Sequence, residues 1–89
     1  MADVPKQSGN EREPGTWGIG GTDGQRTWAC FTCPKCEERY AVGYRRHAIA
    51  EDGTVSPSFV CVTPGCTFHE YIRLVGWNLG SLQPRPDAP

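Results

Sequence analysis

The chain has 89 residues, of which 37% are hydrophobic, and its formal net charge is −1 because basic and acidic residues nearly balance. A chain of this length has room for one small domain, not for an enzyme core with a deep substrate cleft. The balanced charge excludes a polycation that coats nucleic acid through charge alone.

Residues 1–25 are predicted to form a flexible tail. The stretch from Ser8 to Gly24 is rich in glycine and charged residues, and it can bury too little apolar surface to offset the entropy lost on ordering its backbone. Trp17 stands alone in this stretch, and we interpret it as an anchor that becomes ordered when a partner binds. The alternative is that Trp17 packs loosely against the folded domain.

The folded domain is predicted to span residues 26–79 and to consist of β-strands. Residues 25–32 are rich in aromatic and β-forming side chains, and residues 40–49 alternate between two faces as a strand does. The Asp-Gly pair within residues 51–54 is typical of a hairpin turn, after which residues 55–62 are predicted to return as a strand.

The longest β-prone run, residues 67–77, has apolar side chains on both faces, which is typical of a central strand. Residues 80–89 contain repeated prolines, which deny the backbone both helix and ladder hydrogen bonds, so we expect a second flexible tail there. The expected fold is therefore small and mostly β, with a three- to four-stranded antiparallel sheet between two disordered tails.

Four of the five cysteines occur in two pairs with the spacing of metal-binding turns. The two segments are Cys33-Pro34-Lys35-Cys36 and Cys61-Val62-Thr63-Pro64-Gly65-Cys66. Proline and glycine favour a tight turn in each segment, and such a turn directs both of its sulfurs at one ion. The strands between the segments bring the turns together, and four thiolates complete a tetrahedral shell around Zn²⁺. We therefore predict one zinc ion, held by Cys33, Cys36, Cys61 and Cys66.

The same residues allow three alternatives to this site. Cys30 stands three residues before Cys33, but the two residues between them favour a strand over a turn, so we interpret Cys30 as a small buried residue. His69 follows Cys66 by three residues, but strand alternation directs it away from the face of Cys66. Iron in place of zinc is also compatible with four thiolates.

The predicted zinc ion has a structural role. A core of about fifty residues gains little more from apolar burial than it loses in conformational entropy, so it needs a cross-link. Four thiolates also leave no open position on the metal for water or substrate. We therefore expect no catalytic activity.

The two cysteine turns and the strand pair between them resemble a zinc ribbon. More narrowly, their order resembles the Ogr/Delta group of phage late-transcription activators, which has a Cys-Pro-x-Cys turn and a second pair of cysteines four residues apart. The resemblance covers about half of the chain. It implies a small zinc-dependent protein that contacts DNA and the host RNA polymerase. The spacer here is longer, and the basic segment expected after the ribbon is missing.

Basic and aromatic residues of the predicted sheet are candidates for contact with nucleic acid or a partner protein, because such groups hold phosphates and stack bases. Together with Trp17 they are Arg39, Tyr44, Arg45, Arg46, His47 and Arg73. The alternative without a binding role is that these residues form a solvated strand face. The other functional hypothesis is a small phage-type adaptor or inhibitor that binds a host protein without touching nucleic acid.

Two further observations concern the compartment. No apolar run approaches the roughly 18 residues that a membrane-spanning helix needs, and no apolar segment typical of a secretory signal follows the first residues. Five cysteines in such a chain indicate a reducing compartment, where clustered thiols bind metal more often than they form disulfides. We expect a cytoplasmic protein, located in the host cell if a phage encodes it.

Overall fold

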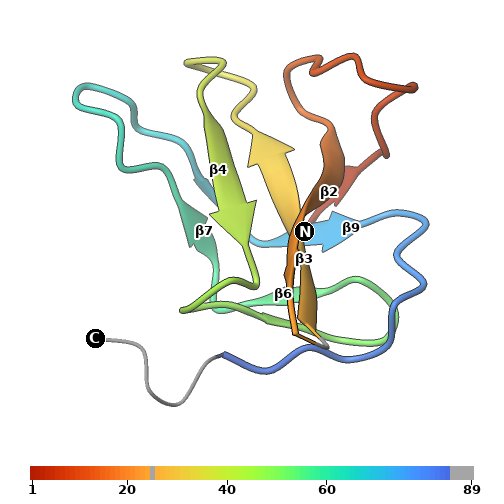
Figure 1. Ribbon diagram of the computed structural model, residues 1–89. Helices are drawn as coiled ribbons and strands as arrows, with labels where there is room; N and C mark the ends of the chain where they lie inside the picture. The colour runs from red at the N-terminus through yellow and green to blue at the C-terminus, as the bar shows by residue number, and fades with distance from the viewer. Residues whose placement is uncertain (25, 85–89) are drawn as a thin grey trace.

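The computed structural model describes residues 1–24 and 26–84, and within these ranges the chain forms nine β-strands and no helix (Figure 1). The strands are β1 (Ala2–Val4), β2 (Trp17–Asp23), β3 (Arg26–Thr32), β4 (Arg39–Val42), β5 (Ala48–Ile49), β6 (Val55–Ser56), β7 (Phe59–Val60), β8 (His69–Glu70) and β9 (Ile72–Leu74). The small, mostly β class predicted from the sequence is confirmed. In the described part of the chain, no helix is long and apolar enough to cross a membrane.

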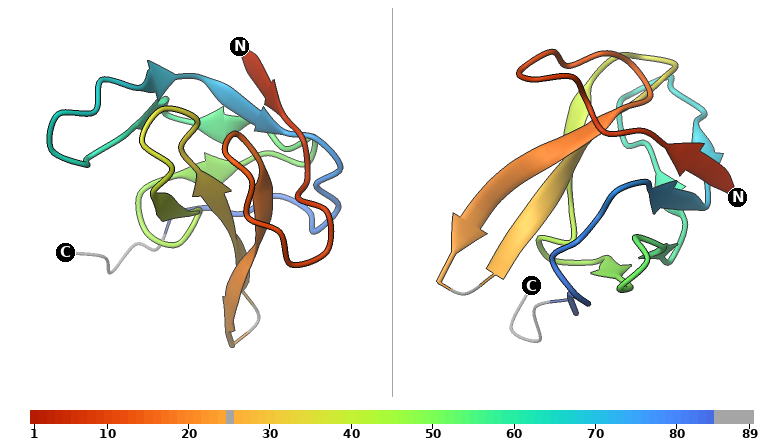
Figure 2. Two further views of the ribbon diagram at one scale, coloured as in Figure 1. Left: turned by 90° about the horizontal axis from the view of Figure 1, so that it is seen from above. Right: turned by 90° about the vertical axis from the view of Figure 1, so that its right-hand side faces the viewer.

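The largest sheet is antiparallel and contains β2, β3 and β4, with β3 in the middle. β3 was predicted from its aromatic and β-forming residues. Its Phe31 lies opposite Trp17 of β2 and Tyr40 of β4, and both Phe31 and Ala29 are buried. The hairpin of β2 and β3 extends beyond the rest of the molecule in both views of Figure 2. One end of this sheet is therefore part of the core, and the other end is an arm.

The glycines of β2 have a packing role, whereas the sequence indicated a flexible segment there. A Cβ atom at Gly20 would lie 2.7 Å from the ring of Trp28 and 2.8 Å from the sulfur of Cys30. A Cβ atom at Gly21 would lie 2.7 Å from the same ring. Glycine is needed at these positions because Trp28 lies directly against the backbone of β2.

The first residues of the chain belong to the core, which corrects the expectation of a flexible N-terminal tail. β1 pairs in parallel with β9, so the sheets are not all antiparallel, and Val4 is buried. Trp17 is only 1% exposed, and its indole N–H donates a hydrogen bond of 2.9 Å to the carbonyl of Val75. The ring of Trp17 also packs against that of Trp77, with 5.7 Å between centroids. The segment is ordered because its apolar residues have partners that are distant in sequence.

The strand predicted over residues 40–49 is interrupted. β4 ends at Val42, and the chain bends through residues 43–46 before β5 begins at Ala48. Gly43 has a φ of +85°, and a Cβ atom there would lie 2.7 Å from Ile49. The alternation predicted for one long strand is lost because the backbone turns over the buried Ile49 at this glycine.

The turn predicted over residues 51–54 is present and connects β5 to β6. The strand predicted over residues 55–62 is divided into β6 and β7, between which Pro57 follows a cis peptide bond. Proline has no N–H group to donate to a ladder, which accounts for the division.

The strand predicted over residues 67–77 is divided as well, because its two parts have different partners. β8 pairs with β7, whereas β9 pairs with β1. The central position expected of this run is wrong, because β9 is one of only two strands in its described sheet. Its Ile72 and Leu74 are fully buried, and they lie on one face of the strand.

The C-terminal tail expected over residues 80–89 is in part ordered. Leu82 is 9% exposed, and its backbone exchanges two hydrogen bonds of 2.7 Å with Ile49. Residue 25 and residues 85–89, which fall in the two predicted tails, lie outside the described part of the chain. One hydrophobic core thus collects residues from Val4 to Leu82, beyond both limits of the predicted domain at 26–79.

Gly53 in the β5–β6 turn provides a test of the packing between this turn and β9. Its φ is +93°, and a Cβ atom there would lie 2.2 Å from the carbonyl oxygen of Leu74. We expect Gly53→Ala to lower the free energy of unfolding by about 3 kcal/mol, since backbone strain and a clash add. Gly76→Ala is the matched control, because φ is +87° but no atom lies within 4 Å of a Cβ there. It should cost about 1 kcal/mol. Urea unfolding of both variants measures the difference, and equal losses would contradict the packing.

Candidate metal centre

The first cysteine turn connects β3 to β4, the central strand and one edge of the main sheet. The backbone N–H of Glu37 donates to the carbonyl of Cys33 at 3.0 Å, and the N–H of Cys33 donates to the carbonyl of Glu38 at 2.8 Å. Glu37 itself has a φ of +65°. These bonds close the turn, which places the sulfurs of Cys33 and Cys36 within 4.8 Å of each other.

The second cysteine turn connects β7 to β8. The backbone N–H of Cys66 donates to the carbonyl of Thr63 at 2.9 Å, and the N–H of Cys61 donates to the carbonyl of Phe68 at 3.0 Å. Gly65 has a φ of +84°, a conformation that favours glycine. The tight turn predicted from Pro64 and Gly65 is therefore present.

The two turns bring four sulfurs together, as predicted from the spacing. The sulfurs of Cys33, Cys36, Cys61 and Cys66 all lie within 4.8 Å of one another. Cys33 and Cys66 are separated by 3.7 Å, and Cys36 and Cys61 by 3.6 Å. A tetrahedral metal with metal–sulfur bonds of about 2.3 Å requires sulfurs about 3.8 Å apart. The cluster can thus hold one metal ion.

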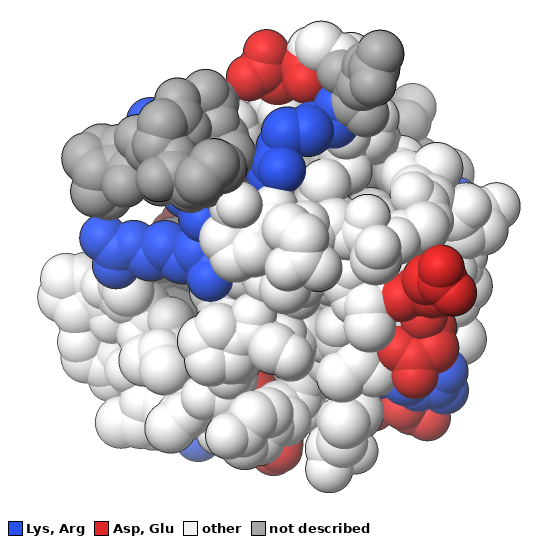
Figure 3. Space-filling model, turned by 90° about the horizontal axis from the view of Figure 1, so that it is seen from below, with Lys and Arg blue, Asp and Glu red and all other residues white. Residues whose placement is uncertain are grey.

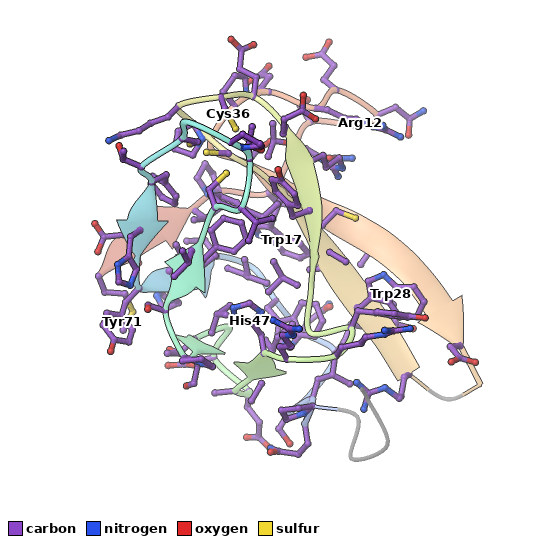
Figure 4. All side chains as sticks on the ribbon, turned by 90° about the vertical axis from the view of Figure 1, so that its left-hand side faces the viewer. Arg12, Trp17, Trp28, Cys36, His47 and Tyr71 are labelled. Atoms are coloured by element: carbon purple, nitrogen blue, oxygen red, sulfur yellow. The ribbon has the colours of Figure 1, made fainter. Side chains whose placement is uncertain are left out.

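The centre is buried on one side and accessible on the other. Cys33 and Cys61 belong to the core, whereas Cys36 and Cys66 are half-buried. A hollow of about 300 Å³ on the open side is lined by Lys35, Cys36, Pro64, Gly65, Cys66 and Thr67. Figure 4 shows Cys36 and the neighbouring sulfurs at one end of the molecule, away from Trp28 and His47.

Thr63 and Tyr40 support the centre, and sequence reasoning did not single them out. The hydroxyl of Thr63 lies 3.5 Å from the sulfur of Cys36 and is hydrogen-bonded to the hydroxyl of Tyr40. Tyr40 comes from β4, so this contact links the second cysteine turn to the main sheet. The available signal was the position of Thr63 inside the second turn, because groups that bond a ligand's sulfur orient it.

The thiols do not ionise alike. Burial raises the pKa of Cys61, but hydrogen bonds from Thr63 and contacts with neighbouring sulfurs outweigh burial and lower this pKa to about 6. At Cys66, the N–H of Phe68 lowers the pKa, but burial and the other three sulfurs raise it to about 11. One thiolate forms readily at neutral pH, and the last one resists ionisation among its neighbours. A bound cation favours all four thiolates and so completes the shell.

Cys30 and His69, the alternative ligands, lie outside the cluster. Cys30 is half-buried on β3, so it is less buried than expected, and its sulfur faces Gly20. His69 is exposed, and its Nε2 lies 2.7 Å from the hydroxyl of Ser58. The preference for Cys33 and Cys36 as the first pair agrees with this geometry.

Three of the predicted binding residues serve the fold. Trp17 is buried in the core, which corrects its assignment as a partner-binding anchor. Arg39 donates to the hydroxyl of Thr32 at 2.7 Å and to the side-chain oxygen of Gln7 at 2.8 Å. Arg73 forms an ion pair of 3.1 Å with Asp3 on β1. Both arginines thus hold the N-terminal segment to the sheets.

The other four predicted binding residues lie together in the β4–β5 connection. Tyr44, Arg45, Arg46 and His47, with Ala41, line a hollow of about 190 Å³. Arg45 and Arg46 are exposed, and Tyr44 and His47 are half-buried. Burial lowers the pKa of His47, a bond with the Ser58 backbone opposes this, and Arg46 adds to the lowering. The imidazole is therefore neutral at pH 7.

No family model, curated protein or solved structure matches this chain. The function is accordingly inferred from the metal centre and from the surface of the molecule.

Proposed function

We propose that this protein is a recognition module of the zinc-ribbon kind, held together by one structural Zn²⁺ and acting as a phage-type transcription regulator that contacts DNA, RNA polymerase or both. The single observation that carries the zinc assignment is the set of four sulfurs within 4.8 Å of one another. Four thiolates with tetrahedral spacing suit Zn²⁺ and leave it no open position, so the metal stabilises the fold and takes no part in a reaction.

The transcription setting rests on the resemblance in the cysteine turns to the Ogr/Delta group, together with the gathering of Tyr44, Arg45, Arg46 and His47 on one loop. Basic and aromatic side chains side by side are typical of nucleic-acid contacts. Apart from Arg45 and Arg46, the chain has seven basic and ten acidic residues, and a four-thiolate zinc site adds about two negative charges. The loop therefore provides the local attraction that the whole molecule lacks.

The zinc assignment predicts one zinc ion per chain in protein purified under reducing conditions. Removing it with a strong chelator should abolish the native circular dichroism and tryptophan fluorescence, because structural zinc contributes on the order of 10 kcal/mol or more in small domains. Elemental analysis and spectra of the same sample are the measurement. Iron in place of zinc would appear as visible absorption and would contradict the assignment, as would a chelated protein with an unchanged spectrum.

Duplex DNA and purified RNA polymerase are the probes for the transcription role. A mobility shift of duplex DNA that weakens steeply with added salt supports DNA contact, and co-purification of zinc-loaded protein with the polymerase supports polymerase contact. Failure of both, with zinc present, would overturn the role in transcription.

A second function is favoured by a different observation, the exposed apolar side chains around β7 and β8. Val60, Val62 and Tyr71 are 53%, 75% and 57% exposed, and exposed apolar surface is a common feature of protein-binding sites. On this reading the protein is an adaptor or inhibitor that binds a host protein. Capture of one host protein by the wild type but not by Val60→Ser/Tyr71→Ser, with no mobility shift of DNA at low salt, would select it.

A further inference from the structure

We propose that the β4–β5 loop, residues 43–47, forms with Trp28 a binding surface for single-stranded nucleic acid. This inference deepens the nucleic-acid contact of the proposed function and rests on it. It names both the place of contact and the form of the strand that fits there.

The loop is held in place by groups outside it. The guanidinium of Arg26 on β3 donates to the carbonyl of Gly43 at 2.9 Å and to the carbonyl of Gln83 at 2.8 Å. At the other end of the loop, the ring of His47 stacks on Phe59, with 6.1 Å between centroids and 27° between planes. A loop held at both ends presents its side chains without a large ordering cost on binding.

Aromatic faces continue from the sheet into this loop. The rings of Trp28 and Tyr44 lie edge to face with 4.5 Å between centroids. The guanidinium of Arg45 lies 5.3 Å from the centroid of the Tyr44 ring. The Trp28 ring packs against the backbone of β2, where Gly20 and Gly21 have no side chains to block it. Both residues are half-buried, and we infer that each keeps ring surface on which a base can stack.

The size and charge of the surface favour a short stretch of strand. The hollow of about 190 Å³ is smaller than typical small-molecule sites, which are about 300–1,000 Å³, so it suits one planar group presented by a polymer. Arg45 and Arg46 are adjacent and exposed, and each can contact a phosphate. On the face shown in Figure 3, basic side chains lie in two groups, at the upper left and at the top, and an acidic group lies beside the upper one. Further acidic side chains lie at the right-hand edge, across a wide uncharged area.

A single strand fits these features better than a duplex. Aromatic stacking requires unpaired bases, which a duplex does not offer. A duplex-binding protein usually neutralises many phosphates, whereas this surface offers two exposed arginines.

The test uses the full zinc-loaded chain and two fluorescein-labelled probes, oligo-dT and oligo-rU of about 12 nucleotides, with fluorescence anisotropy over a range of salt. For two phosphate contacts, log K should fall with log salt with a slope of about −1.4. Arg45→Ala/Arg46→Ala should raise the Kd at least about tenfold and bring the slope close to zero. Tyr44→Ala should raise the Kd about fivefold or more through lost stacking. A preference for either probe supports the inference and identifies the natural strand.

Arg12→Ala is the matched control, because Arg12 is exposed and lies at the opposite end of the molecule from His47 in Figure 4. It should leave the Kd within about twofold of the wild type. If Tyr44→Ala fails to fold, the Arg45→Ala/Arg46→Ala variant still tests the inference, because both arginines are exposed. No binding of either probe, or equal losses for Arg12→Ala and the double variant, would overturn the inference. Binding of duplex DNA or polymerase without binding of either probe would overturn the inference and leave the proposed function standing. Purified protein that contains no zinc would instead overturn the proposed function.

Discussion

Replacing Cys61 or Cys36 by serine is expected to unfold the protein. Each change removes one of four sulfurs that lie within 4.8 Å of one another and could hold one metal ion, and structural zinc in small domains contributes on the order of 10 kcal/mol or more. A domain of this size has a total stability of about 5–15 kcal/mol, so the loss removes most of it. Circular dichroism, with zinc analysis of the same samples, measures the effect.

Cys30→Ser is the control for both serine variants. Cys30→Ser is the same substitution at a half-buried position outside the cluster. We expect it to lower the free energy of unfolding by only about 1 kcal/mol and to leave the zinc content at one ion per chain. Equal damage from Cys30→Ser, Cys36→Ser and Cys61→Ser would show that the ligand set is wrong.

Trp17→Ala is expected to lower the free energy of unfolding by about 3–5 kcal/mol, as large-to-small changes in cores do. Trp17 is 1% exposed, packs against Trp77 and donates its indole N–H to Val75. A flexible tail would predict no change at all, so this substitution separates the two accounts of the N-terminal segment. Urea unfolding of the zinc-loaded protein is the measurement.

Two variants accompany Trp17→Ala. Trp17→Phe keeps an aromatic ring but loses the donor to Val75, so we expect a smaller loss of about 1–3 kcal/mol. Ile19→Ala lies on the same strand at a position that is 49% exposed, and it should change the stability by less than about 1 kcal/mol. A loss for Ile19→Ala as large as that for Trp17→Ala would mean that the order of burial along β2 is wrong.

The elements predicted best are those whose residues specify a local conformation. The Asp-Gly turn within residues 51–54 and the proline-containing cysteine turns need only neighbouring residues to form. The β3 strand is similar, since its aromatic and β-branched residues favour an extended backbone wherever they lie. The long strands predicted over residues 40–49 and 55–62 were interrupted at Gly43 and Pro57, which are themselves visible in the sequence.

The candidate binding residues show the limit of local reasoning. Arg39 and Arg73 have the same chemistry as Arg45 and Arg46, but the first two are bonded to Gln7 and Asp3 in the N-terminal segment. Alternation along an assumed strand could not distinguish them, because the partners lie more than thirty residues away. Trp28 was likewise missed as a surface residue, since its place beside Tyr44 depends on the bend at Gly43.

From its amino acids alone, this chain determined its two cysteine turns, its hairpin turn and its preference for strands, because proline, glycine and β-branched side chains act on their own backbone. Only the tertiary structure decided that the glycine-rich N-terminal segment is ordered. β1 pairs with β9, and Trp17 enters the core beside Trp77. The same glycines that raise the entropy of an isolated segment allow close approach once Trp28 packs on them. Which effect of glycine prevails depends on neighbours that only the folded chain provides.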